Sequence, residues 1–197
     1  RHIAKSYCNG QFALAGVSGA LMAASGFEGV DDVLGMPDGV LDAWGTSGAA
    51  DVVLQGLGED WPIRGSNFKF INAGYPIHSP VEAATTLVAE HGIDLAKIES
   101  IYVGMPTTSM LIVDNRDMHN ICLQDMLSAA LVLGGLKLRE SPFPEALNHP
   151  LFSHLRPRVT LRGDPELDRD QPMGRGAIVV ITTFDLDEYV HGALKAG

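Results

Sequence analysis

Two adjacent stretches decide the fold of this chain: KFINAGYPIH at residues 69–78 and SPVEAATTLVAE at residues 79–90. In the second stretch Ser79 is a suitable N-cap, and Pro80 suits the first helical position. Glu82 completes a capping box with the serine. Together these signals predict a helix that runs through the second stretch.

Strand and helix signals continue on both sides of this helix. Residues 67–72 alternate apolar and polar side chains in the manner of a strand. Residues 121–133 carry apolar side chains at helical spacing, and Gly134 and Gly135 end that helix. Apolar or β-branched runs predict three further strands at 98–104, 158–162 and 177–183. The sequence therefore predicts an α+β domain over residues 63–197.

Residues 1–62 have a different character and predict a helical segment. From residue 11 to 24 apolar side chains recur every three or four positions, while glycines and alanines form a small-residue face, which predicts a helix packed closely against another. Two short helices are predicted after it, at 30–34 and 40–44. Residues 51–57 fit a helical turn or a strand, of which we expect the helix. We place a domain boundary near residue 62.

Composition and charge exclude several classes of protein. The chain has 197 residues, of which 46% are hydrophobic and 19% charged, so it can bury a sizeable core and is not disordered. Its 14 Lys and Arg oppose 24 Asp and Glu, for a net charge of −10, which argues against a nucleic-acid partner. No apolar stretch reaches about 18 residues, so we expect no membrane partner. Two distant cysteines, Cys8 and Cys122, fit a soluble protein of the reducing cytoplasm.

A cation and a histidine flank the start of the predicted helix. Lys69 can donate hydrogen bonds to a carboxylate, and His78, with an ordinary pKa of about 6.5, can move a proton near neutral pH. Because a helix N-terminus also favours anions, this segment suits the binding and activation of a small acid. The alternative is a surface lysine and a histidine that only caps or packs.

Other polar groups carry weaker signals. The sequence DNRD at 114–117 fits either a loop salt bridge or an arginine clamp for carboxylates. His149 and His154 have no nearby cysteine, and no HExxH motif occurs, so we expect no metal site. No phosphate-loop lysine follows the glycine pairs, so we expect no nucleotide cofactor.

Taken in order, these motifs resemble the MmgE/PrpD family, which includes 2-methylcitrate dehydratase and cis-aconitate decarboxylase. KSYCNG at 5–10 and GVSGALMAASGF at 16–27 resemble its lysine-containing helix and the continuation of that helix. The stretch 69–84 is similar to the family segment of a lysine, a histidine and a following Glu-Ala-Ala. DNRDM at 114–118 resembles a loop before a family helix. The resemblance covers nearly the whole chain.

The resemblance implies a large all-helical domain and a smaller α+β lid domain, with the active site in the cleft between them. It implies a homodimer and acid/base chemistry without metal or organic cofactor, on a small di- or tricarboxylic acid, as in a lyase of the dehydratase type. Three residues match catalytic positions of the family: Lys5, Lys69 and His78. Three further residues are expected to bind substrate: Tyr75, Asn115 and Arg116.

Other interpretations stay open beside this one. A further histidine of cis-aconitate decarboxylase falls on Gly74, and a catalytic tyrosine of that enzyme aligns with Val113, which argues against the decarboxylase reaction. The chain starts at Arg1 with residues typical of a helix interior, so we expect a fragment, inactive by itself, that joins the end of the helical domain to the lid. The alternatives are a non-catalytic carboxylate-binding or dimerisation module, and an isomerase or epimerase of the same family.

Overall fold

The computed structural model describes residues 4–46, 50–136, 143–171, 174 and 176–183. The chain forms two compact units, and the boundary between them along the chain falls between Asn67 and Phe68. The composition change predicted this boundary near residue 62. Within the described residues, no helix has both the length and the apolar character that a membrane span needs.

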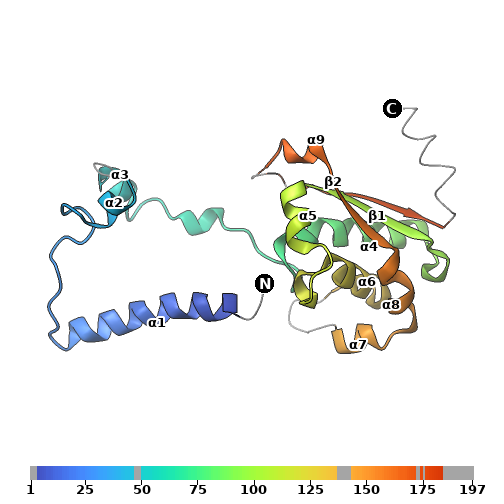
Figure 1. Cartoon of the computed structure of the whole chain (residues 1–197), viewed down its shortest axis with the longest axis horizontal. Coiled ribbons are helices and arrows are strands. Elements are labelled where there is room, and N and C mark those ends of the chain that lie inside the picture. The colour runs from blue at the N-terminus through green and yellow to red at the C-terminus, as the bar shows by residue number, and fades with distance from the viewer. Residues whose placement is uncertain (1–3, 47–49, 137–142, 172–173, 175, 184–197) are drawn as a thin grey trace. The chain divides into compact units, whose positions relative to one another are not determined.

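A three-stranded sheet forms one side of the second unit (Figure 1). Strand β1 (Ser100–Met105) is parallel to β2 (Val159–Gly163) on one side and antiparallel to β3 (Ile178–Thr182) on the other. Ile101 of β1 pairs with Ile181 of β3. The strands predicted from the β-branched and apolar runs are therefore confirmed.

Two helices cover one face of this sheet: α4 (His78–His91) and α6 (Leu123–Leu133) (Figure 1). Their apolar faces pack against alternate residues of β1 to form a single core. Side chains in that core with no exposed surface include Ile77, Ile101, Val103, Leu123, Met126 and Leu127. Burying one such side chain contributes about 1.5–3 kcal/mol to the free energy of unfolding. The α+β class predicted for this part of the chain is confirmed.

The remaining elements of this unit are short. They are the helices α5 (Thr107–Val113), α7 (Phe143–Leu147), α8 (Pro150–Leu155) and α9 (Pro165–Asp168), and the 3-10 turns η2 (Tyr75–Ile77), η3 (Leu95–Lys97), η4 (His119–Ile121) and η5 (Arg156–Arg158). The Asp168 carboxylate accepts hydrogen bonds from the Thr107 N–H at 2.7 Å and from its hydroxyl at 2.8 Å. These bonds tie α9 to the N-terminus of α5.

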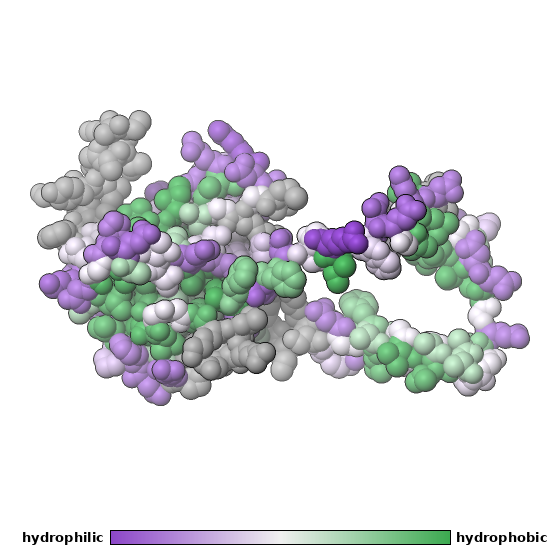
Figure 2. Space-filling model, turned by 180° about the vertical axis from the view of Figure 1, so that it is seen from behind, coloured by the Kyte–Doolittle hydropathy of each residue, from purple (hydrophilic) through white to green (hydrophobic). Residues whose placement is uncertain are grey.

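The first unit contains α1 (Ala4–Ala24), α2 (Val40–Ala43), α3 (Ala50–Leu54) and the 3-10 turn η1 (Pro62–Gly65). Apolar side chains of α1 lie at its surface (Figure 2): Leu14, Val17 and Leu21 are 57%, 60% and 66% exposed. Among the described residues, no neighbouring segment comes within 4 Å of a Cβ placed on Gly16 or Gly19. The close helix packing predicted from the small-residue face is therefore not made within this part of the chain.

One of the short helices predicted in the first unit is wrong. Residues 31–35 form turns rather than a helix. The Asp32 carboxylate accepts a hydrogen bond from the Gly35 N–H at 2.8 Å, and such a bond competes with the helical pattern. The helix predicted at 40–44 is present as α2, and the helix favoured for 51–57 is present as α3.

The segment before α4 also differs from its prediction. Residues 67–72 form no strand, because the chain bends at their end, where the Ala73 N–H donates to the Ile71 carbonyl at 2.9 Å. Ser79 is not an N-cap, because η2 runs directly into α4, which begins one residue earlier. The helix itself is confirmed.

Candidate functional site

The turn that leads into α4 is held from two sides. Pro76 lies in η2, and the fully buried side chain of Ile77 anchors the turn in the core. On the other side, the Gly74 N–H donates to the Asn120 carbonyl of η4 at 2.6 Å. The backbone that joins Lys69 to α4 is therefore fixed by contacts with residues far along the chain.

Lys69 and His78 meet at the backbone carbonyl of Ala73. The Lys69 ammonium donates to this oxygen at 2.9 Å. The His78 ring forms a hydrogen bond to the same backbone group, and the positive charge of Lys69 acts on that ring. The two side chains that the sequence singled out as a cation and a proton carrier thus lie beside one another.

The surroundings of His78 lower its pKa from the ordinary value of 6.5. Burial is the largest cause, because removal from water disfavours the charged imidazolium, and the Lys69 ammonium is the second. The bond to Ala73 and the Glu82 carboxylate act in the opposite direction. The net effect keeps His78 neutral near pH 7, which is the form that accepts a proton.

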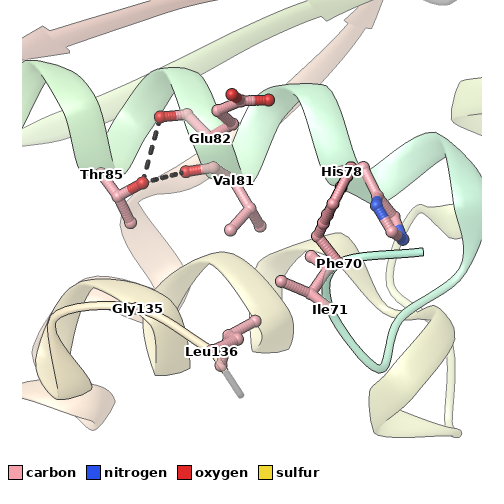
Figure 3. Close-up of a pocket in the computed structure, with 8 residues that line it drawn as sticks. All are labelled: Phe70, Ile71, His78, Val81, Glu82, Thr85, Gly135 and Leu136. Carbon is pink, nitrogen blue, oxygen red and sulfur yellow. Dashed lines mark hydrogen bonds between the residues drawn. The ribbon is translucent and has the colours of Figure 1, made fainter. Parts of the chain in front are cut away.

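Beside His78 lies a pocket of about 260 Å³ (Figure 3). Its lining residues come from the segment before α4, from α4 itself and from the residues that follow α6: Phe70, Ile71, His78, Val81, Glu82, Thr85, Gly135 and Leu136. The Thr85 hydroxyl is bonded back onto its own helix, 2.8 Å from the Val81 carbonyl. The pocket is slightly smaller than the usual range of about 300–1,000 Å³ and suits a small ligand.

Tyr75 lies next to His78. Their ring centres are 5.7 Å apart and their planes are tilted by 32°. The Tyr75 side chain is 37% exposed. The structure thus places three of the predicted site residues in one short segment: Lys69, Tyr75 and His78.

Asn115 lies in the loop after α5 in a left-handed conformation, with a φ of 43°. Its main-chain N–H donates to the Gln124 side chain at 3.0 Å, and its amide donates to Asp114 at 3.0 Å. The Asp114 carboxylate also accepts a bond from Gln124 at 2.6 Å. Arg116, which follows, is partly buried. These bonds fix the loop that carries two of the predicted substrate-binding residues.

The remaining predicted catalytic residue, Lys5, lies in the first turn of α1, in the first unit. The other five predicted site residues lie in the second unit. The structure therefore relates Lys69 and His78 to one another but does not relate them to Lys5.

A comparison with protein families settles the membership of the chain. The family model for the MmgE/PrpD C-terminal domain matches residues 72–193. The chain belongs to the MmgE/PrpD family. The matched region contains Tyr75, His78, Asn115 and Arg116, whereas Lys69 lies just before it. A comparison with curated proteins finds no match.

The structure shows two buried polar residues in this MmgE/PrpD chain that the sequence patterns did not single out. Gln124 and Asp125 lie in the first turn of α6, where they are 2% and 3% exposed. The available signal was a charged residue within an otherwise apolar helix, because a buried charge requires partners.

The MmgE/PrpD chain also contains a buried cysteine next to Gln124. Cys122, at the N-cap of α6, is fully buried, and burial raises the pKa of its thiol. The thiol therefore stays protonated near neutral pH and is a poor nucleophile and metal ligand. Within the described ranges, no three His, Cys, Asp or Glu side chains are grouped to hold a metal ion.

Proposed function

We propose that this chain is part of a lyase of the dehydratase type that acts on a small di- or tricarboxylic acid. The observation that carries the proposal is the meeting of Lys69 and a neutral His78 at the Ala73 carbonyl. Removal of a proton next to a carboxylate needs a base and a nearby positive charge, and this pair supplies both. An isomerase or epimerase of the same family would use the same proton step.

In the proposed reaction, His78 accepts a proton from the carbon next to a substrate carboxylate. The electron pair of that C–H bond forms the C=C bond while the C–O bond on the neighbouring carbon breaks. The leaving hydroxide takes up the proton that His78 has accepted and departs as water, which returns His78 to its neutral form. Lys69 binds the carboxylate and stabilises its developing charge. An ammonium has three N–H donors, and the Ala73 carbonyl occupies one of them.

The other predicted residues complete the proposal. Lys5 is proposed as a second catalytic lysine, and three residues are proposed as further substrate contacts: Tyr75, Asn115 and Arg116. We propose that the reaction needs no metal or organic cofactor, since the histidine and the lysines supply the base and the positive charge. Turnover should therefore survive dialysis against a chelator.

Paired variants test the proposal. Turnover of citrate and 2-methylcitrate is followed by NMR in D2O, in the intact lyase of which this chain is proposed to be part and in its Lys69→Ala and His78→Ala variants. Lys97→Ala and His91→Ala are matched controls, because both side chains are exposed in the same unit. Lys69→Ala should lower kcat/KM by about 30-fold to several thousand-fold, the equivalent of about 2–5 kcal/mol for a charge left unpaired.

His78→Ala should depress kcat more than it raises KM, because loss of a proton acceptor affects the chemical step. All variants are compared as folded proteins. If both site variants keep kcat/KM within about threefold of the parent, which is about 0.7 kcal/mol, the two residues are not the catalytic pair.

We propose as a second candidate that the chain acts as an assembly module that forms a homodimer. The observation in its favour is the exposed apolar face of α1, which includes Leu14, Val17 and Leu21. Light scattering on the chain should give the mass of a dimer, and the double substitution Leu14→Asp with Leu21→Asp should give a monomer. A monomeric parent would eliminate this candidate and leave the lyase proposal untouched.

A further inference from the structure

The first turn of α6 holds a pair of polar side chains that the packing almost completely removes from water. Gln124 is 2% exposed and Asp125 is 3% exposed, in a helix whose other residues up to Leu131 are also buried. Burying a carboxylate is costly unless it is paired and hydrogen-bonded. The partners of these two side chains therefore show what the pair does.

Asp125 joins two separate turns to α6. One carboxylate oxygen lies 2.6 Å from Nδ1 of His119 in η4, and the other accepts a bond from Nε of Arg156 in η5 at 2.5 Å. Both oxygens are therefore occupied. Because His119 is on the 3-10 turn that precedes α6, this contact fixes the position of that turn against the helix.

The same turn contacts the segment that carries Lys69 and His78. The Asn120 carbonyl, next to His119, accepts the Gly74 N–H at 2.6 Å. A Cβ placed on Gly74 would lie 3.4 Å from the Ile121 side chain, so the two segments are in contact. The position of Gly74 in turn sets the direction of the adjacent Ala73 carbonyl, to which Lys69 donates.

Gln124 fixes the position of the loop that carries Asn115 and Arg116. Its carbonyl oxygen accepts the Asn115 main-chain N–H at 3.0 Å, and its NH2 group donates to Asp114 at 2.6 Å. The first of these bonds stabilises a residue with a positive φ. Of these two neighbouring residues, Gln124 thus contacts the loop that carries Asn115 directly, whereas Asp125 reaches the segment that carries Lys69 and His78 through η4.

We propose that Gln124 and Asp125 are positioning residues for the candidate site. Asp125 holds the Lys69–His78 segment through His119 and Gly74, and Gln124 holds the loop that carries Asn115 and Arg116. The use of these segments in catalysis rests on the proposed function, whereas their positioning by this pair is a property of the chain itself. The pair fixes the geometry of the site without touching substrate.

Amide hydrogen exchange measured by NMR on the full chain tests this division of roles. Asp125→Asn keeps the volume of the side chain but presents an NH2 group where an acceptor is needed, so the Gly74 amide should exchange at least tenfold faster. Gln124→Met keeps the volume and removes both hydrogen bonds, so the Asn115 amide should exchange at least tenfold faster. Each variant should change the other amide less than its own.

Two further variants separate positioning from general destabilisation. His119→Asn keeps a donor near the position of Nδ1, so the Gly74 amide should exchange at the parent rate in this variant. His119→Ala removes the donor and should raise the exchange rate of Gly74 as Asp125→Asn does. Asp168→Asn is the matched control, because Asp168 also accepts two hydrogen bonds but anchors α5 instead of η4. It should leave the Gly74 and Asn115 amides unchanged.

The outcomes distinguish the inference from the proposed function. Equal acceleration of both amides in all variants, including Asp168→Asn, or unchanged rates in Asp125→Asn and Gln124→Met, would overturn the positioning roles. The proposed function is measured separately, by citrate binding to the parent and to Lys69→Ala. Accelerated exchange with no citrate binding would support the positioning roles and contradict the carboxylate site.

Discussion

Replacement of Asp125 by Ala should lower the free energy of unfolding of the second unit by about 2–3 kcal/mol. Breaking a fully buried ion pair costs about 3–5 kcal/mol, whereas an exposed pair contributes about 0.2–1 kcal/mol. The carboxylate is 5% exposed, but its partners Arg156 and His119 are 39% and 46% exposed. Water therefore replaces the lost carboxylate in part, and the expected cost falls between the two limits.

Urea unfolding monitored by circular dichroism measures this change. A double-mutant cycle with Arg156→Met separates the pair from the loss of packing, and the coupling energy should be about 1–2 kcal/mol. Lys97→Ala is the matched control, because Lys97 forms an exposed pair with Asp94 at 3.9 Å, and its effect should stay below about 0.5 kcal/mol. A change of less than about 0.5 kcal/mol for Asp125→Ala would refute the reasoning.

Three other predictions follow from local features of the second unit and of α1. The pKa of His78 is lower in the folded chain than in the unfolded chain, so the unfolded chain binds a proton at His78 more readily, and the free energy of unfolding should fall as the pH drops below 6.5. An NMR titration should also show a higher His78 pKa in Lys69→Met, because that substitution removes a nearby positive charge. Asn115→Val should cost about 1–2 kcal/mol in urea unfolding, because its φ of 43° is unfavourable for a β-branched residue, whereas Asn115→Gly should not. Leu127→Ala should lower the free energy of unfolding by about 2–5 kcal/mol in urea, since Leu127 is fully buried. Leu14→Ala is the control, because Leu14 is exposed on α1, and it should change the thermal unfolding transition little.

The elements that sequence patterns predicted well are those whose signal is local. The run of β-branched residues in β3 and the apolar spacing of α6, closed by Gly134, each lie within one element. The segment 67–72 shows the limit of such patterns. Alternation makes a strand only where another strand is available to pair, and here the chain instead bends at Ala73, whose carbonyl binds Lys69.

The sequence singles out candidate site residues, but it does not give their geometry. Lys69 and His78 lie nine positions apart, a separation that allows many arrangements in a non-helical segment. The arrangement observed depends on the bond from the Gly74 N–H to the Asn120 carbonyl. No pattern within the segment itself indicates that partner, because it comes from a different part of the chain.

Asp125 shows why a residue visible in the sequence was still missed. An acidic residue in the first turn of a helix is ordinary, because it interacts favourably with the positive end of the helix dipole. At an exposed position such a carboxylate needs no further partner. In α6 the packing of the helix against the core removes Asp125 from water, and only then do the bonds to His119 and Arg156 become necessary. An acidic residue within a helix predicted to be buried on all sides therefore indicates that distant residues must supply its partners, even before those partners can be named.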